Sequence, residues 1–117
     1  MTPFRSVVPG IAVAPQIQPE DAARAASDGY TLIVNNRPDG ESEDQTGGAA
    51  IAAAAGELGL AYVSVPVAPG GFSREQVTQM AAALDSAQGP VLAYCRSGTR
   101  STLLWSLVQA SKGDDPK

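Results

Sequence analysis

The chain has 117 residues, with 8 basic against 12 acidic side chains and a formal net charge of −4. This balance argues against the basic face that general nucleic-acid binding needs, and no apolar stretch reaches the roughly 18 residues of a membrane span. With no histidine and one cysteine, the usual Cys/His zinc sites, a Ser-His-Asp triad, a Cys-His pair and an intrachain disulfide are excluded.

The first half of the chain alternates short apolar runs with a helical pattern. A Pro9-Gly10 turn precedes a short first strand over 11–13. Pro19 begins a helix that runs to about Ala26, and Gly29 suits the position just after its end. Residues 31–34 form a compact, largely β-branched run that is typical of a buried strand, and a polar, acidic loop follows over 35–48.

The second half repeats this alternation. The alanine-rich segment 49–58 predicts a packing helix that ends at Gly59, and a second buried strand follows over 61–65. Ser73 and Gln76 form a capping box that opens a helix through about residue 87. A third buried strand over 91–94 leads into a last helix from about Thr99. The apolar stripe of that helix comprises Leu103, Leu104, Leu107 and Val108.

Strands that are separated by helices favour parallel pairing, so the sequence predicts one α/β domain over 1–111 with a small parallel-rich sheet flanked by helices. A polar tail over 112–117 is expected to be mobile. Ligands of such sheets bind beyond the carboxyl ends of the strands. Cys95 lies at such an end.

The segment from Cys95 to Ser101 has the pattern of an anion-binding loop. It joins a buried strand to a helix through a glycine, so that backbone N–H groups and the helix N-terminus can face one anion. Such a loop should stabilise the Cys95 thiolate and leave it reachable by solvent. We therefore predict Cys95 and Arg100 as catalytic residues. The predicted anion-binding residues of the loop are Arg96, Ser97, Gly98, Thr99 and Ser101, with Ser101 or Thr99 bonded to the thiolate.

Two family resemblances meet in this chain. The stretch C-R-S-G-T-R-S over 95–101 resembles the active-site loop of single-domain rhodaneses, whereas the arrangement of the whole chain resembles the dual-specificity phosphatase fold. Together with the segments 35–41 and 66–73, these features resemble the beta-lactamase hydrolase-like, phosphatase-like domain family (DUF442) over roughly residues 4 to 111. The resemblance implies a cysteine-phosphatase-like architecture. Because the chain stops about sixteen residues after Ser101, it also implies that the last helices of that fold are missing or that a partner covers the exposed face.

Loop length separates the two chemistries that the resemblance offers. Four residues stand between Cys95 and Arg100, as in rhodaneses, whereas cysteine phosphatases have five, and Ser101 occupies the position of their arginine. Phosphatases of this fold also take an Asp general acid from a loop before the cysteine, and 60–73 contains neither Asp nor Glu. Asp39 is therefore the predicted general acid, with Glu41, Glu43 and Asp44 as alternatives, although a solvated acidic loop is the favoured interpretation.

Arg37 leaves a strand end on the same side of the sheet as Cys95, so it is predicted either to bind the anionic substrate or to brace the acidic loop. The favoured function is rhodanese-type sulfur transfer through a Cys95 persulfide, because sulfur transfer needs no general acid. The first alternative is a phosphatase that acts through a phosphocysteine. The second is a non-catalytic anion-binding module.

The expected ligand is a small anion: thiosulfate, a persulfide or a phosphate ester. We expect no cofactor, no metal, no nucleic acid and no membrane. The expected protein partner is a second copy of the chain or a metallo-beta-lactamase-like sulfur dioxygenase, to which the resembling domains are often fused. The opening segment lacks the apolar core of a signal peptide, so a cytoplasmic location is expected.

Overall fold

A computed structural model describes residues 2–68 and 70–113. Its nine elements are β1 (Arg5–Val8), β2 (Ile11–Ala14), α1 (Pro19–Ser27), β3 (Leu32–Asn35), α2 (Gly48–Glu57), β4 (Ala61–Ser64), α3 (Arg74–Ser86), β5 (Val91–Tyr94) and α4 (Thr99–Gly113). The five strands form one sheet in the order β1-β2-β5-β3-β4. Only β1 is antiparallel to its neighbour, so the structure confirms the predicted parallel-rich α/β sheet.

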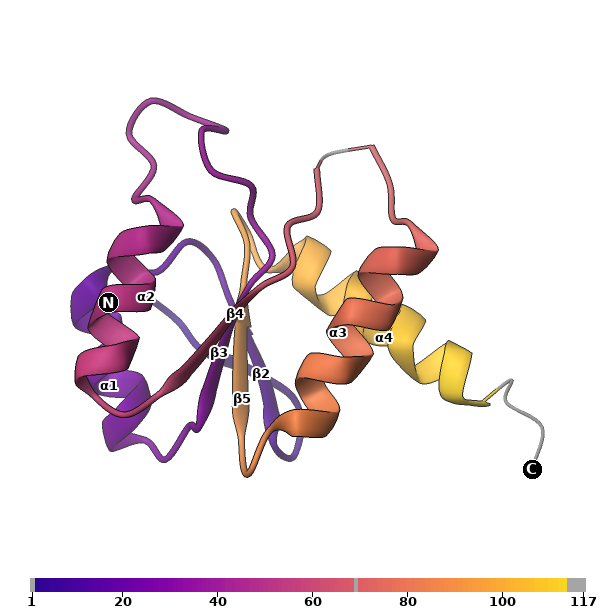
Figure 1. The fold of residues 1–117 in the computed structure, drawn as a ribbon, viewed down its shortest axis with the longest axis horizontal. Coiled ribbons are helices and arrows are strands. Elements are labelled where there is room, and N and C mark those ends of the chain that lie inside the picture. The colour runs from indigo at the N-terminus through magenta and orange to yellow at the C-terminus, as the bar shows by residue number, and fades with distance from the viewer. Residues whose placement is uncertain (1, 69, 114–117) are drawn as a thin grey trace.

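Helices cover both faces of this sheet, with α1 and α2 on one side and α3 and α4 on the other (Figure 1). Alternate residues of the central strand β5 enter the two layers, as the pleat of a strand requires. Leu92 and Tyr94 pack with α1 and α2, whereas Val91 and Ala93 pack with α3 and α4. Tyr94 is therefore a core residue of the layer that α1 and α2 form with the sheet.

The parallel pairing of β2, β5 and β3 brings the carboxyl ends of these strands to one edge of the sheet. The residues just beyond those ends, Gln16, Cys95 and Arg37, are therefore neighbours in space although they are far apart in sequence. This edge is where α/β sheets bind ligands. The fold thus fixes the place of the site before any side chain is considered.

Three details differ from the sequence prediction. The strand β1 was not predicted, because its residues Arg5 and Ser6 are exposed and give it no apolar run. The strand β4 lies at the sheet edge and is half-exposed, so it is not the buried strand that residues 61–65 suggested. The helix α4 continues to Gly113 and includes the first residues of the predicted tail, whose remainder lies outside the described residues.

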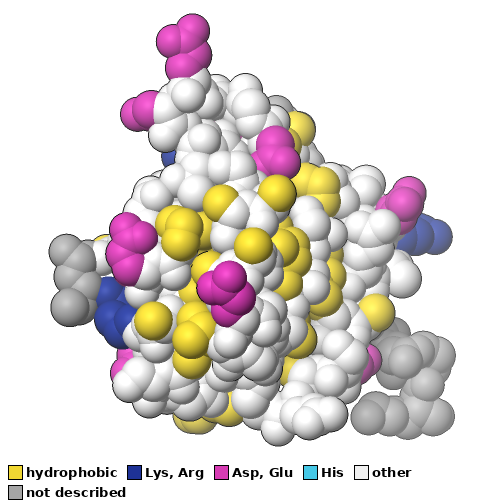
Figure 2. Space-filling view, turned by 60° about the vertical axis from the view of Figure 1, so that its left-hand side comes forward, with side chains coloured by type: hydrophobic (Ala, Val, Ile, Leu, Met, Phe, Trp, Pro, Cys, Tyr) yellow, Lys and Arg dark blue, Asp and Glu magenta, His cyan; other side chains and the backbone are white. Residues whose placement is uncertain are grey.

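The apolar stripe of α4 is also only half correct. Leu104 and Val108 are fully buried, but Leu103 and Leu107 are 48% and 39% exposed. On the opposite side of the molecule, α2 buries Ile51 and Ala55, and hydrophobic side chains are spread over the outer surface of this side among isolated acidic ones (Figure 2). In the described part of the chain, no helix has both the length and the apolar character to cross a membrane.

Candidate active site

The loop between β5 and α4 places Cys95 at the centre of the sheet edge. The Cys95 N–H donates to the carbonyl of Ala14 at 3.3 Å, which fixes the residue against β2. Gly98 has a φ of 92°, a conformation that side-chain-bearing residues rarely adopt, and this turn directs its N–H towards the sulfur. The Gly98 N–H donates to Cys95 Sγ at 3.0 Å. At least one loop amide therefore faces the sulfur as the sequence predicts.

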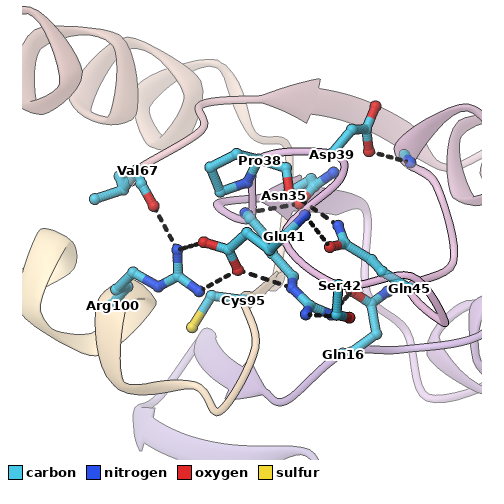
Figure 3. A network of polar contacts seen from close by, with 12 residues as sticks. Gln16, Asn35, Pro38, Asp39, Glu41, Ser42, Gln45, Val67, Cys95 and Arg100 are labelled. Carbon is cyan, nitrogen blue, oxygen red and sulfur yellow. Dashed lines mark hydrogen bonds and ion pairs between the residues drawn. The ribbon is translucent and has the colours of Figure 1, made fainter. Parts of the chain in front are cut away.

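The sulfur itself is not reachable by solvent, which corrects the prediction. Cys95 is 0% exposed. Its strand is central, and the side chains of Arg100 and Glu41 lie next to it in the site (Figure 3). A substrate can therefore reach the sulfur only if side chains around it move.

Arg100 is bonded to a carboxylate. Its Nη1 and Nη2 donate to Glu41 Oε2 and Oε1 at 2.6 and 2.8 Å, and Nη1 also donates to the Val67 carbonyl at 2.6 Å. The hydrogen bonds to Glu41 raise the pKa of Arg100, and the charge of nearby Cys95 adds to this rise. Arg100 thus contacts the acidic loop and the segment after β4 while it stays near the sulfur.

Arg37 also donates a hydrogen bond to the Glu41 carboxylate. It is buried, and its Nε donates to Glu41 Oε1 at 3.0 Å. Its two remaining nitrogens donate to Gln16 Oε1 at 2.9 Å and to Ser42 Oγ at 3.2 Å. Of the two predicted roles for Arg37, this geometry corresponds to the bracing of the acidic loop.

The environment of Glu41 keeps it ionised. The hydrogen bonds from Arg100, and after them the single bond from Arg37, lower the pKa of Glu41 from 4.5 to about 2 against the opposing effect of burial. At neutral pH this side chain is a fixed negative charge. It therefore holds no proton for a leaving group.

Asp39, the predicted general acid, points elsewhere. Its Oδ1 accepts a hydrogen bond from the Gly48 N–H at 2.8 Å, so it binds the start of α2 (Figure 3). This contact explains the position, because the first N–H groups of a helix lack partners within the helix. The structure gives no contact between Asp39 and Cys95.

The other predicted loop residues divide into an exposed and a buried group. Ser97 donates to the hydroxyl of Thr99 at 3.1 Å, and both side chains are exposed, as is that of Arg96. Ser101 is buried and donates to Asn36 Oδ1 at 2.8 Å. The structure therefore contradicts the predicted hydrogen bond to the thiolate for both Ser101 and Thr99. Ser101 lies in the first turn of α4 and binds Asn36, the residue that follows β3, instead of the sulfur.

Sequence reasoning missed Gln16 and Asn36, and it considered Glu41 only as an alternative proton donor or, preferably, as part of a solvated acidic loop. Gln16 and Asn36 follow the carboxyl ends of β2 and β3, the two neighbours of β5. That strand-end position is a signal that could have found them. A hollow of about 300 Å³ beside the loop is lined by Gln16, Gln18, Arg37, Ser42, Asp44, Gln45 and Arg96.

Comparison with known proteins identifies the class. Residues 3–112 match the model of the family described as "Beta-lactamase hydrolase-like protein, phosphatase-like domain". The chain belongs to this family, as its sequence resemblance implies.

The particular relatives are the following. A beta-lactamase hydrolase-like protein of Xylella fastidiosa is 36% identical over 103 residues, which are 88% of this chain and 24% of that protein. The chain thus spans about a quarter of the length of the curated relatives it matches. The crystal structure of a "putative phosphatase" from Neisseria meningitidis has a TM-score of 0.83 at 32% identity and covers 95% of this chain and 79% of that one. Tk-PTP, at 15% identity and a TM-score of 0.64, covers 81% of this chain and 61% of its own and shows the shared fold alone.

Proposed function

We propose that the chain is a phosphatase-like enzyme that acts through a covalent intermediate on Cys95, with a phosphate monoester as its first candidate substrate. The observation that carries this proposal is the Gly98 N–H directed at a buried Sγ beside Arg100. The fold and the names of the relatives support phosphoryl transfer better than sulfur transfer, and no relative described above is named a sulfurtransferase. This support reverses the order in which the sequence placed the two reactions.

In this reaction the Cys95 thiolate attacks phosphorus, the phosphorus–oxygen bond breaks, and the alkoxide or phenoxide leaves. Water then attacks the phosphocysteine, so that inorganic phosphate is released and the thiolate is restored. Backbone N–H groups and Arg100 would stabilise the charge that develops on the phosphoryl oxygens. Neither Glu41, which is ionised, nor Asp39, which binds α2, is placed to protonate the leaving group, so we propose that water supplies this proton.

Because Glu41 is ionised and Asp39 is directed at α2 instead of the sulfur, neither side chain is placed to protonate a leaving group, and this predicts that the enzyme hydrolyses only a narrow range of phosphate esters. General acid catalysis is worth about a hundredfold or more. We therefore expect para-nitrophenyl phosphate, whose leaving group is stable as an anion, to be hydrolysed at least about a hundredfold faster than glycerol phosphate. Steady-state rates at pH about 6, near the second pKa of a phosphate ester, measure this ratio. Comparable rates for both esters would show that some group does supply a proton.

Sulfur transfer is the second candidate, and one specific observation favours it. The same ionised Glu41 that cannot protonate an alkoxide is no obstacle to a reaction without an alkoxide leaving group. In that reaction the thiolate attacks a sulfane sulfur, the sulfur–sulfur bond of the donor breaks, and a Cys95 persulfide and the donor's anion form. A second thiol then removes the sulfur. The Cys95–Arg100 spacing supports this candidate as well.

Mass spectrometry of the intact protein separates the candidates. Incubation with para-nitrophenyl phosphate, followed by acid quenching, should add one phosphoryl group to wild type and nothing to Cys95→Ser, and turnover by that variant should fall to background. If thiosulfate adds one sulfur atom and the ester adds nothing, sulfur transfer replaces phosphoryl transfer. If neither substrate modifies the protein and neither is turned over, while Cys95→Ser still binds phosphate, the chain is an anion-binding module and the proposal of an enzyme is wrong.

A further inference from the structure

Glu41 accepts hydrogen bonds from the two terminal nitrogens of Arg100, which are the groups that would otherwise bind a substrate anion. An arginine recognises phosphate or sulfate through two parallel N–H groups, and these are the groups it offers to a carboxylate. Both terminal nitrogens of Arg100 donate to Glu41, at 2.6 and 2.8 Å. The carboxylate therefore stands where an incoming oxyanion would make its strongest contact.

A second arginine keeps Glu41 in this position. Arg37 is 4% exposed and donates to Glu41 Oε1 at 3.0 Å while it is itself bonded to Gln16 and Ser42. Glu41 therefore has an anchor that does not depend on Arg100. An anion that takes over Arg100 leaves Glu41 close by, and the two negative charges repel each other.

We propose that Glu41 is a specificity-determining residue, an internal carboxylate that competes for Arg100 and disfavours doubly charged groups relative to singly charged ones. Coulomb repulsion from a fixed charge is proportional to the charge of the ligand, so a dianion is penalised more than a monoanion. The favoured substrate class carries one negative charge on the reacting group, such as a singly protonated phosphate ester or a persulfide. This inference rests on the proposed function only in placing the substrate anion at Arg100.

Binding measurements test the inference without any turnover. In a ¹⁵N–¹H NMR titration at constant ionic strength, the Gly98 amide reports on the loop, with sulfate as the dianion and nitrate as the monoanion. Glu41→Gln should bind sulfate about tenfold more tightly than wild type and nitrate no more than about threefold more tightly. Glu43→Gln, which removes the same charge from an exposed position of the same loop, should change both affinities by less than about twofold.

Other outcomes overturn the inference. Unchanged or weaker sulfate binding by Glu41→Gln would show that Glu41 only holds Arg100 in place. Equal gains for sulfate and nitrate would show competition without selection by charge. Glu41→Asp is the second variant in case the first fails to fold, because it keeps the charge but shortens the reach to Arg100. It should bind sulfate more tightly than wild type, and failure to do so would count against the inference. Because no reaction is measured, a failure of the proposed chemistry leaves these results interpretable.

Discussion

The Glu41 carboxylate connects the acidic loop to the surroundings of Cys95 through its bonds to Arg100 and Arg37, and its charge depends on pH. Its pKa is about 2 in the folded protein and 4.5 as the ordinary value, because Arg100 and Arg37 bind the ionised form. Between these two values the unfolded chain binds more protons than the native one, so stability falls as the pH falls. The stabilisation from Glu41 is fully present above pH about 5 and is lost as the pH approaches about 2.

This direction of the pH dependence predicts how the stability of Glu41→Gln, whose side chain cannot titrate, compares with that of wild type. At pH 7 the variant should have a lower free energy of unfolding than wild type. The difference should shrink steadily between pH about 5 and about 2. Urea denaturation at several pH values measures it, with Glu43→Gln as the control for loss of an acidic charge from an exposed position. A difference that stays constant over this range would mean that the ion pairs with the arginines do not hold Glu41 ionised.

At the level of single residues, sequence could place Cys95, Gly98 and Arg100, because their loop is contiguous in the chain. It could not show that Arg100 is paired, because Glu41 lies 59 positions away in the chain. That pairing depends on how a polar loop folds back over the sheet edge, and such a loop carries no periodic pattern. Asp39 and Glu41 are two positions apart, yet only the conformation of the loop decides which of them meets the site.

Among the connections between elements, the turn from β5 into α4 depends on one glycine. Gly98 has a φ of 92°, so an alanine there should cost about 1–2 kcal/mol of stability and turn the amide away from Sγ. Gly56 lies inside α2 and has open space around its Cα. Gly56→Ala should therefore stabilise the protein by about 0.5 kcal/mol and leave activity unchanged. Thermal unfolding and turnover of both variants check this pair, and equal effects would contradict the assigned role of Gly98.

A buried hydrogen bond ties the start of α4 to the end of β3. Ser101 donates to Asn36 Oδ1 at 2.8 Å, and Asn36 Nδ2 donates to the Val65 carbonyl at 3.0 Å. Ser101→Ala leaves a buried acceptor without its donor and should cost about 1–3 kcal/mol. Ser106→Ala, on the exposed face of the same helix, should stay within about 0.5 kcal/mol of wild type. Similar losses in both variants would mean that the bond to Asn36 contributes little.

Across the whole molecule, the two hydrophobic layers meet in the central strand, and the outer helices differ in how much they bury. Leu104 of α4 is 0% exposed and its neighbour Leu103 is 48% exposed. Leu104→Ala should cost about 2–5 kcal/mol, because it leaves a cavity beneath the helix. Leu103→Ala should cost less than about 1 kcal/mol. Chemical denaturation of the two variants measures the difference, and equal losses would show that α4 packs through a different face.

The alternation of elements along the chain was sufficient to predict the sheet, its parallel character and the edge that carries the site. The apolar runs of β3 and β5 predict burial well because both faces of these strands are covered. The apolar residues of β4 gave a wrong prediction of burial, because Tyr62 and Val63 are residue types typical of a central strand although β4 lies at the sheet edge. In α4, four leucine and valine residues suggested one buried stripe, but contact with the neighbouring helix and sheet decides which two of them are covered.

The two outermost strands have a consequence for handling the protein in these experiments. Open edges of a sheet are templates on which other chains can add strands and aggregate. Here each border strand has only four residues. One has an irregular register between Ser6 and Val8 and exposes Arg5, and the other is followed two positions later by Pro66, which has no N–H to donate. Such borders resist strand addition by other chains, so refolding from denaturant should proceed without the formation of fibrils.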